Sequence, residues 1–286
     1  VYVRNQMNPR QISKIALSPE VVDCIVFWTK NPKPMLAKLD TLGAYAYYFQ
    51  FTLTGYGADI ECGLPDKKHV IIPTFQELSQ KIGAQRVIWR YDPILFTENY
   101  TPEYHLKAFG EIAERLRGYT EQCVISFVDI YAENQKNMQA LRIRSLEESE
   151  LTAFAVKIAQ IARENGMKVT SCAEAVDLSA CGIAHNCCID KNLIAQITGS
   201  RICADKDKNQ RKECGCVESI DIGTYNTCKN GCRYCYANHS PECVAQSCQM
   251  YDENSPVLCG RITDEDKVTE RIVKSFKENQ LTVWDL

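Results

Sequence analysis

Short apolar runs alternate with amphipathic stretches along the first 170 residues of the chain. The runs are rich in β-branched and aromatic residues, which favour strands, whereas apolar residues three or four apart favour helices. This pattern predicts strands at 21–28, 47–54, 86–91, 122–128 and 167–171, with a sixth at 219–225. It predicts helices at 34–42, 74–82, 101–117, 145–165 and 264–277.

Strand and helix units that repeat in this order predict a parallel sheet covered by helices, and six such units favour a barrel. We therefore expect an α/β fold, a parallel (β/α) barrel that is incomplete or circularly permuted, with its body at 1–171. Residues 172–286 would add a cysteine-rich metal-binding segment, the last barrel strand and the C-terminal helix. The chain begins Val1-Tyr-Val-Arg, as if a strand were already under way, so we expect that N-terminal residues are missing.

Composition narrows the classes of function. With 286 residues, 45% of them hydrophobic, the chain can bury a full core. Its net charge of −3 argues against nucleic acid as a partner, because nucleic-acid-binding surfaces are basic. It has no run of 18 apolar residues and no signal peptide, so we expect a cytoplasmic protein without a membrane partner.

Cysteine is unusually frequent, with 16 residues, and it is unevenly distributed. Only Cys24, Cys62 and Cys123 precede residue 172, and all the others fall between Cys172 and Cys259. A disulfide scaffold is normally a short secreted chain with cysteines throughout its length. The clustered distribution instead favours metal-bound thiolates in a reducing compartment.

The most informative motif is a C-x3-C-x2-C loop formed by Cys228, Cys232 and Cys235. Three thiolates close together suit three corners of a cubane 4Fe–4S cluster and leave the fourth iron free for a small ligand. The strand predicted at 219–225 would deliver this loop to the same edge as the other strand ends. A structural zinc site is the alternative, because zinc also accepts thiolates.

A second group of cysteines precedes this loop and is large enough for another four-thiolate site. Our preferred set is Cys172, Cys188, Cys214 and Cys216, because Cys172 ends a predicted strand and Cys214-Gly-Cys216 is a tight two-ligand turn. Zinc suits this set as well as a second iron–sulfur cluster does. The last three cysteines, Cys243, Cys248 and Cys259, stay unassigned.

In a parallel barrel the chemistry lies where the strands end, at their carboxyl edge. Polar side chains gather at the predicted strand ends: Thr29, Lys30, Asn31, Gln50, Thr52, Thr54, Arg90, Asp92, Ser126, Asp129, Cys172 and Glu174. Singly, each is typical of a solvated strand end, and their common position is the stronger signal. Lys30 and Arg90 are the leading candidates, because a cation after an apolar strand suits a carboxylate or phosphate ligand.

Nearly the whole chain resembles a family of bacterial and archaeal proteins described as a domain of unknown function, numbered 1848. Members of that family usually begin with a segment containing Ser-Arg-Arg-Thr-Asp, which is absent here. The resemblance implies no activity. It rests on long matching stretches: Val26-Phe-Trp-Thr-Lys-Asn-Pro32, Phe49-Gln-Phe-Thr-Leu-Thr54, Val87-Ile-Trp-Arg-Tyr-Asp-Pro93, Ser126-Phe-Val-Asp129, and Asp221 to Ala237.

The loop from Cys228 to Ala237 resembles the cluster loop of radical S-adenosylmethionine enzymes, especially the spore photoproduct lyase group, whose loop ends Cys-x-Tyr-Cys-Tyr. Thr29-Lys30 and Arg90-Tyr-Asp-Pro93 resemble strand ends of that group. The resemblance implies a 4Fe–4S cluster that binds S-adenosylmethionine and cleaves it reductively. In that superfamily the loop normally follows the first barrel strand, and a circular permutation would reconcile its late position here. The chain has no Gly-Gly-Glu-like segment for the methionine amino group.

On this interpretation the substrate is a small molecule, and the electron donor is a protein such as ferredoxin or flavodoxin. The candidate catalytic residues on the substrate side are Lys30, Arg90 and Asp92. The candidate cofactor contacts are Thr52, Thr54, Tyr234 and Tyr236. Two alternatives stay open: an electron-transfer protein with two fully thiolate-ligated clusters, and a binding module whose cysteines hold zinc.

Overall fold

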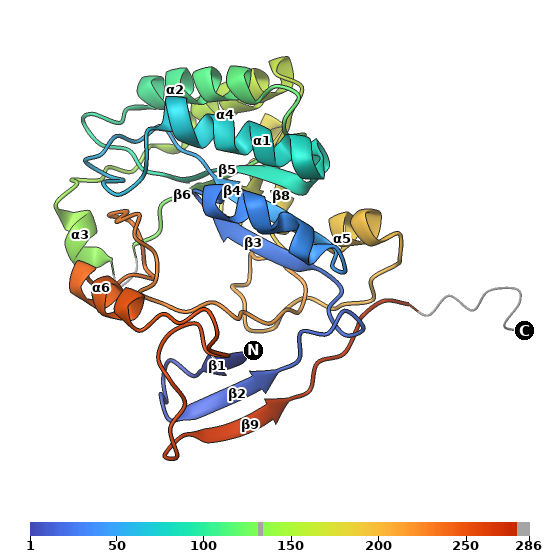
Figure 1. The fold of residues 1–286 in the computed structure, drawn as a ribbon. Coiled ribbons are helices and arrows are strands. Elements are labelled where there is room, and N and C mark those ends of the chain that lie inside the picture. Colours follow the sequence, from blue (N-terminus) through green and yellow to red (C-terminus); the bar gives the residue numbers. More distant parts are fainter. Residues whose placement is uncertain (131–133, 279–286) are drawn as a thin grey trace, which may run out of the picture.

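The computed structural model describes residues 1–130 and 134–278, and its centre is a six-stranded sheet whose strands all run parallel (Figure 1). Because the strands are parallel, their carboxyl ends meet at one edge of the sheet. Neighbours in the sheet are also neighbours in sequence: β3 (Ile25–Thr29), β4 (Tyr47–Thr52), β5 (Val87–Ile94), β6 (Gln122–Phe127), β7 (Lys168–Cys172) and β8 (Ala184–Asn186).

Three helices cover one face of this sheet: α1 (Ile72–Ile82), α2 (Pro102–Leu116) and α4 (Glu148–Glu164) (Figure 1). Their starts follow known capping chemistry. Thr101 accepts the backbone N–H of Tyr104 and caps α2, while Glu147 and Glu150 form a capping box that opens α4. A strand followed by a capped helix returns the chain to the sheet from one side, which places each new strand beside the last.

The main hydrophobic core lies between the sheet and these three helices. Phe49 of β4 and Trp89 of β5 are fully buried there, and Trp89 stacks on Phe109 of α2 with ring centroids 4.7 Å apart. Side chains of a strand alternate between its two faces. The residues between these core positions therefore point to the opposite face of the sheet.

That opposite face carries a smaller apolar cluster, in which Tyr48, Ile88 and Val124 from three adjacent strands are buried. Ile194 of α5 (Lys191–Thr198) packs against them. Towards the carboxyl edge the same face becomes polar, as described below. The sheet thus has one face that packs on helices in the main core, and an opposite face that is apolar at first and polar at the carboxyl edge.

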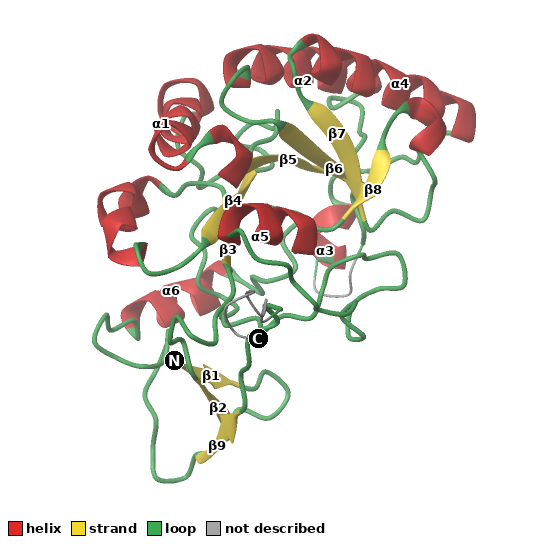
Figure 2. Cartoon of the chain, turned by 90° about the vertical axis from the view of Figure 1, so that its right-hand side faces the viewer, coloured by secondary structure: helices red, strands yellow, loops and turns green. Residues whose placement is uncertain are grey.

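A second, three-stranded sheet of order β1-β2-β9 lies at the far end of the molecule from α1, α2 and α4 (Figure 1). It joins β1 (Tyr2–Arg4) and β2 (Gln11–Ile15) to β9 (Lys267–Arg271), which runs parallel to β2. Figure 2 shows it set apart from the six-stranded sheet. The remaining elements are short: η1 (Lys33–Leu42), η2 (Lys67–Ile71), η3 (Ala84–Arg86), α3 (Gln135–Gln139), η4 (Ser179–Cys181) and α6 (Pro241–Gln249).

The α/β class, the parallel sheet and the first five predicted strands are confirmed: β3 to β7 lie at the five predicted runs. Within the described residues the sheet is an open run from β3 to β8, and a closed barrel is not seen there. The predicted division after residue 171 falls within β7, before its last residue, and it stays a prediction. The described part of the chain contains no helix with the length and apolar character needed to cross a membrane.

Two predicted elements are wrong. Residues 219–225 form no strand; there Asp221 accepts the backbone N–H of Gly223 at 2.7 Å, a local bond that competes with strand pairing. The sixth strand of the sheet is β8, which the sequence pattern missed because it is three residues long and polar. The helix predicted at 264–277 is also wrong, because Lys267–Arg271 pairs with β2 as strand β9.

Candidate functional site at the carboxyl edge

The carboxyl ends of the parallel strands bring most of the predicted site residues to one edge. Lys30 follows β3 directly, Arg90 and Asp92 lie near the end of β5, and Cys172 is the last residue of β7. Ligand sites of parallel sheets lie outside this edge, because loops from several strands converge there. Two separate groups of contacts form among these residues.

Glu61 is the centre of the first group, which we call the Glu61 cluster: Lys30, Thr54, Glu61, Lys67 and Tyr234. Its Oε1 accepts hydrogen bonds from Lys30 Nζ at 2.8 Å, from Thr54 Oγ1 at 2.9 Å and from the Tyr234 hydroxyl. Its Oε2 faces Lys67 Nζ in a close ion pair that lacks hydrogen-bond alignment. The Glu61 side chain is 1% exposed, so a buried carboxylate is surrounded by four donors.

Two lysines keep Glu61 charged in spite of burial. Burial acts to raise the pKa of this carboxyl, but attraction by Lys30 and Lys67 outweighs it and brings the pKa of Glu61 to about 2. Burial also lowers the pKa of Lys67, and the charge of Glu61 opposes that shift. Lys67 Nζ donates to the carbonyl oxygens of Thr54 at 2.9 Å and Tyr56 at 2.5 Å, and its charge also faces Glu61 Oε2 in the ion pair.

The cysteine loop at 228–235 lies against residues 60–63, which follow β4. Glu61 and Cys232 face each other in an antiparallel bridge, and Tyr234 extends from the loop into the Glu61 cluster. The ring of Tyr234 also lies 5.3 Å from Lys30 Nζ. Two backbone hydrogen bonds of 2.9 Å join the segments: Arg233 N to Ile60 O, and Gly63 N to Asn230 O.

A close approach within this interface requires glycine. Gly231 has φ of +60°, in the left-handed region, and a Cβ there would lie 2.6 Å from the Sγ of Cys62. Cys62 itself donates to the carbonyl oxygen of Gly231 at 3.3 Å. The sequence Cys-Lys-Asn-Gly-Cys therefore lets the loop pass directly over Cys62.

The three thiols of the loop lie near the surface of the protein. Cys228 is exposed, whereas Cys232 and Cys235 are partly buried. Burial raises the pKa of Cys232 to about 11, and the nearby charge of Lys30 acts in the opposite direction. Among the described residues, no three or more Cys, His, Asp or Glu side chains are already arranged around a common metal position.

Arg90 is the centre of the second group of contacts. Its Nε donates to Asp92 Oδ2 at 2.8 Å, and its Nη2 also binds this carboxylate. Its Nη1 donates to the Sγ of Cys188 at 2.8 Å and to Gln50 Oε1 at 3.3 Å. Arg90 is 5% exposed, and the neighbouring carboxylate holds the pKa of its guanidinium well above the usual value although burial opposes this.

Cys188 belongs to a buried thiol cluster, by which we mean Cys172, Cys188, Cys214 and Cys216. Apolar packing groups Cys188, Cys214 and Cys216 together, with Cys172 against them. The Sγ atoms of Cys172 and Cys188 are 2.9 Å apart, and Cys216 Sγ accepts the backbone N–H of Ile189 at 3.3 Å. The four thiols that the sequence selected for a second site are therefore neighbours in the fold.

The acidic residues beside Arg90 complete this side of the edge. The Ser126 hydroxyl donates to Asp92 Oδ1, and Glu174 Oε1 accepts the backbone N–H of Phe127 at 2.7 Å. Burial raises the pKa of Glu174 to about 7, with like charges nearby adding to the shift. Asp129 forms an ion pair with Arg211 at 2.5 Å.

The structure thus brings together many of the predicted residues, but in two sets. Lys30, Thr54 and Tyr234 meet in the Glu61 cluster, whereas Arg90 and Asp92 lie at the buried thiol cluster. Thr52 is partly buried at the end of β4, where it pairs with Arg90 of β5, and Tyr236 is largely exposed. These two cofactor assignments stay predictions.

Sequence reasoning missed Glu61 and Lys67. Both follow β4, in the stretch Gly55-Tyr-Gly-Ala-Asp that leads to Ile60-Glu-Cys62 and then to Lys67. The same rule about strand ends that selected Thr54 could have included this loop. What the sequence lacked was any sign that a carboxylate seven residues beyond Thr54 would fold back onto it.

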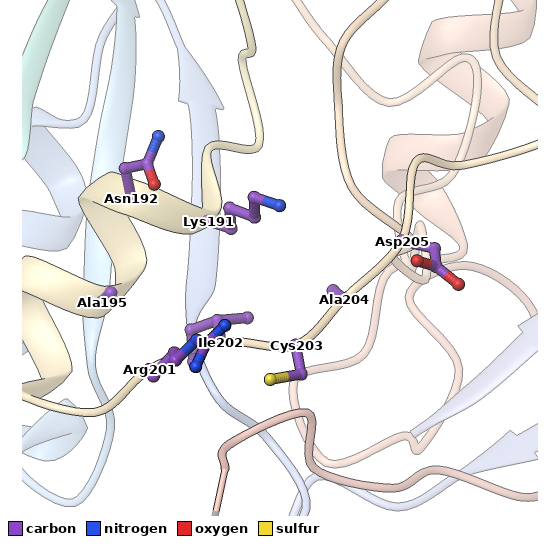
Figure 3. Close-up of a pocket in the computed structure, with 8 residues that line it drawn as sticks. All are labelled: Lys191, Asn192, Ala195, Arg201, Ile202, Cys203, Ala204 and Asp205. Carbon is purple, nitrogen blue, oxygen red and sulfur yellow. The ribbon is translucent and has the colours of Figure 1, made fainter.

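A separate pocket of about 430 Å³ lies between the start of α5 and the segment 201–205 (Figure 3). Lys191, Arg201 and Asp205 are its charged lining residues, and Cys203 also borders it. Arg201 pairs with Glu278 at 3.3 Å. None of the predicted site residues lines this pocket, so it is distinct from the two clusters at the carboxyl edge.

Fold and site together define an α/β protein with a parallel six-stranded sheet and two cysteine-containing polar groups at its carboxyl edge. Residues 1–237 match the model of the family described as Domain of unknown function (DUF1848). The chain belongs to this family. A search of the curated proteins finds no match.

Proposed function

We propose that this chain is an iron–sulfur protein, and that it acts as a radical S-adenosylmethionine-type enzyme on a small molecule. The observation that carries the proposal is the docking of the Cys228–Cys235 loop onto the carboxyl edge of a parallel sheet, with Tyr234 hydrogen-bonded to Glu61. Tyr234 thus brings the loop into contact with Glu61 and Lys30 at this edge. A complete barrel, beyond the described open sheet, belongs to this proposal.

The donor set of the loop fits an iron–sulfur cluster. Three cysteines on one short loop, with one thiol exposed and two partly buried, can be reached by iron. Lys30 favours the thiolate form of Cys232, as a metal ligand requires. Because no metal-ready arrangement is present among the described residues, binding would require the three side chains to turn towards one another.

When bound, a 4Fe–4S cluster with one open iron would supply the electron for reductive cleavage of S-adenosylmethionine. The chain's own residues position the loop and its surroundings. Tyr234 and the backbone bridge at Cys232 fix the loop to the segment after β4. Lys30 offers a positive charge at the same place, which suits an anionic group of a ligand.

The buried thiol cluster is a candidate for a second metal, either zinc or iron–sulfur. Its four thiols come from the end of β7, the residues after β8 and the turn at 214–216, so a metal there would tie three segments together. Arg90 would offset the charge of the thiolates through its bond to Cys188. Two thiols on one tetrahedral zinc stand about 3.8 Å apart, so Cys172 and Cys188, now at 2.9 Å, would have to separate.

Anaerobic reconstitution, with iron and zinc counts and electron paramagnetic resonance of the reduced protein, tests this function. We expect a cluster signal that shifts when S-adenosylmethionine is added and is lost in Cys232→Ala. The matched control is Cys243→Ala, a partly buried cysteine outside the loop, which should keep the signal. An iron signal that the cofactor leaves unshifted would indicate electron transfer, and zinc without iron would indicate a binding module held by its cysteines.

A further inference from the structure

The two basic residues that follow apolar strands differ in how many of their hydrogens have a partner. Arg90 is bound on three sides, by Asp92, Gln50 and Cys188. Lys30 Nζ, by contrast, donates one hydrogen bond within the described residues, to Glu61 Oε1. A lysine ammonium has three hydrogens, so two of those on Lys30 remain available.

The partners of Lys30 cannot take up these two hydrogens. Glu61 Oε1 already accepts from Thr54 and Tyr234 as well, and Glu61 Oε2 faces Lys67. The ring of Tyr234 is an additional neighbour of Lys30 Nζ, at 5.3 Å, but it is no hydrogen-bond acceptor of comparable strength. The Lys30 side chain is 13% exposed, so a ligand can reach it from outside.

The charges of the Glu61 cluster do not cancel. Lys30 and Lys67 carry two positive charges when both are protonated, and the single carboxylate of Glu61 supplies one negative charge, which leaves one positive charge. Lys67 is fully engaged with Glu61 and with two backbone carbonyls, so the uncompensated charge is accessible at Lys30. A partly buried, unbalanced cation attracts an anion.

We propose that Lys30 binds the carboxylate group of a small molecule, next to the cysteine loop. A carboxylate carries one negative charge and has two oxygens for the two available hydrogens of Lys30. A phosphate monoester carries about −1.5 to −2 charges and would overcompensate the single excess charge. The site is formed by side-chain contacts that need no metal, so it is independent of the proposed cluster.

The test is a titration of the full-length protein with acetate before any iron is added, followed by nuclear magnetic resonance of 13C-labelled lysine side chains. Lys30 is assigned by its absence in Lys30→Met. We expect the Lys30 signal to shift and to saturate with acetate, and inorganic phosphate to bind more weakly. In Lys30→Met binding is read from the signal of Lys67, which shares Glu61 with Lys30, and loss of a charge-assisted hydrogen bond should weaken acetate binding about tenfold or more.

Two variants control this measurement. Lys33→Met removes an exposed lysine three residues away and should leave acetate binding unchanged. Lys30→Arg keeps the charge and the donors and should retain binding. A shift at Lys30 that grows linearly without saturation, acetate binding that persists unchanged in folded Lys30→Met, or tighter binding of phosphate than of acetate would overturn the proposal. If Lys30→Met does not fold, Lys30→Arg assigns the Lys30 signal, and its saturation in the wild type decides, with the Lys33 signal as reference.

Because this experiment uses the protein without iron, its result does not depend on the proposed function. Failure of the cysteine loop to load iron would count against the iron–sulfur proposal and leave the anion site standing. Failure of acetate to bind would remove the anion site and leave the cluster untouched. Binding of both would place a carboxylate ligand beside the cysteine loop.

Discussion

The two thiol groups at the carboxyl edge use the same residue types at different depths. The loop thiols of 228–235 come from one short segment and lie near the surface, with Lys30 beside them. The thiols of the buried cluster come from three segments and are closed in around Arg90. The two cations differ in what remains for a ligand: four of the five N–H hydrogens of Arg90 are bonded to Asp92, Gln50 and Cys188, whereas Lys30 uses one hydrogen of three. The comparison teaches that these two strand-end cations, which look equivalent in sequence, have different roles.

Replacement of Arg90 should give the largest effect on stability. Arg90→Met leaves the carboxylate of Asp92, the amide of Gln50 and the thiol of Cys188 without their shared donor. Loss of one partner from a buried ion pair costs about 3–5 kcal/mol. Urea unfolding at pH 7 measures this as a lower midpoint with an unchanged slope.

Lys30→Met is the matched control for Arg90→Met. Its removal leaves Glu61 with Lys67, Thr54 and Tyr234, so we expect a smaller loss of about 1.5–3 kcal/mol, as for one hydrogen bond to a charged group. Equal losses of stability in the two variants would contradict the distinction between Arg90, most of whose hydrogens are bonded, and Lys30, which uses one of three.

The variant Glu61→Gln tests the Lys30 interaction by removing the negative charge of its partner. The amide keeps the shape of the carboxylate but leaves Lys30 and Lys67 without a counter-charge, which should cost about 3 kcal/mol. The double variant Glu61→Gln/Lys30→Met should lose less free energy of unfolding than the sum of the two single losses, because the residues interact directly. Asp66→Asn, at an exposed ion pair with His69, should change the unfolding midpoint only slightly.

The contrast between the two cations could be predicted only in part from sequence. Short apolar runs rich in β-branched and aromatic residues located β3 to β7, and the rule that chemistry lies at strand ends selected Lys30, Thr54, Arg90 and Asp92. Proximity of four thiols from distant segments also followed, because Cys172 ends a strand and Cys214-Gly-Cys216 is a tight turn. The strands and the proximity of the thiols are confirmed, because local pattern and the geometry of a parallel sheet are sufficient for them, whereas the roles of the selected residues stay predictions.

The rest depended on contacts between segments that no local pattern encodes. Glu61 meets Tyr234, which lies 173 positions further along the chain, through the docking of one loop on another. The strand predicted at 219–225 was wrong because a side chain, that of Asp221, bonds the local backbone and overrides the apolar alternation. β9 depended on its pairing with β2, which is distant in sequence.

Acid should destabilise the helix-covered core independently of both thiol groups, through His105. This residue is buried between the Tyr91 hydroxyl and the carbonyl oxygen of Leu95, each at 2.9 Å from a ring nitrogen, and burial lowers its pKa from 6.5 to about 4. The unfolded chain therefore binds the proton first, and stability falls as the pH drops from about 6.5 to 4. The full loss is about 3 kcal/mol.

The variant His105→Gln distinguishes the pH dependence caused by His105 from effects at the carboxyl edge of the sheet. Unfolding midpoints of the wild type and the variant, measured from pH 7 to pH 4, should converge, because only the wild type loses the contribution of a neutral histidine. Parallel curves would show that His105 does not titrate in this way. The Arg90 and Lys30 variants are therefore best compared at pH 7, where His105 is neutral in the folded state and mostly neutral in the unfolded chain.

The smallest expected effect tests how tightly the surface loop is held at Cys62. Gly231→Ala introduces a side chain at φ of +60° and within 2.6 Å of Cys62 Sγ, whereas Gly118→Ala introduces one at φ of +81° with nothing within 4 Å. The backbone conformation alone costs about 1–2 kcal/mol, so Gly118→Ala should lose about this much and Gly231→Ala more. In a Cys62→Ala background the excess at Gly231 should disappear, since the contact that causes it is gone. If the excess persists there, it does not come from the contact with Cys62, and the backbone hydrogen bonds to residues 60–63 hold the loop in place. The loop would then have less freedom to rearrange around a metal than its exposed thiols indicate.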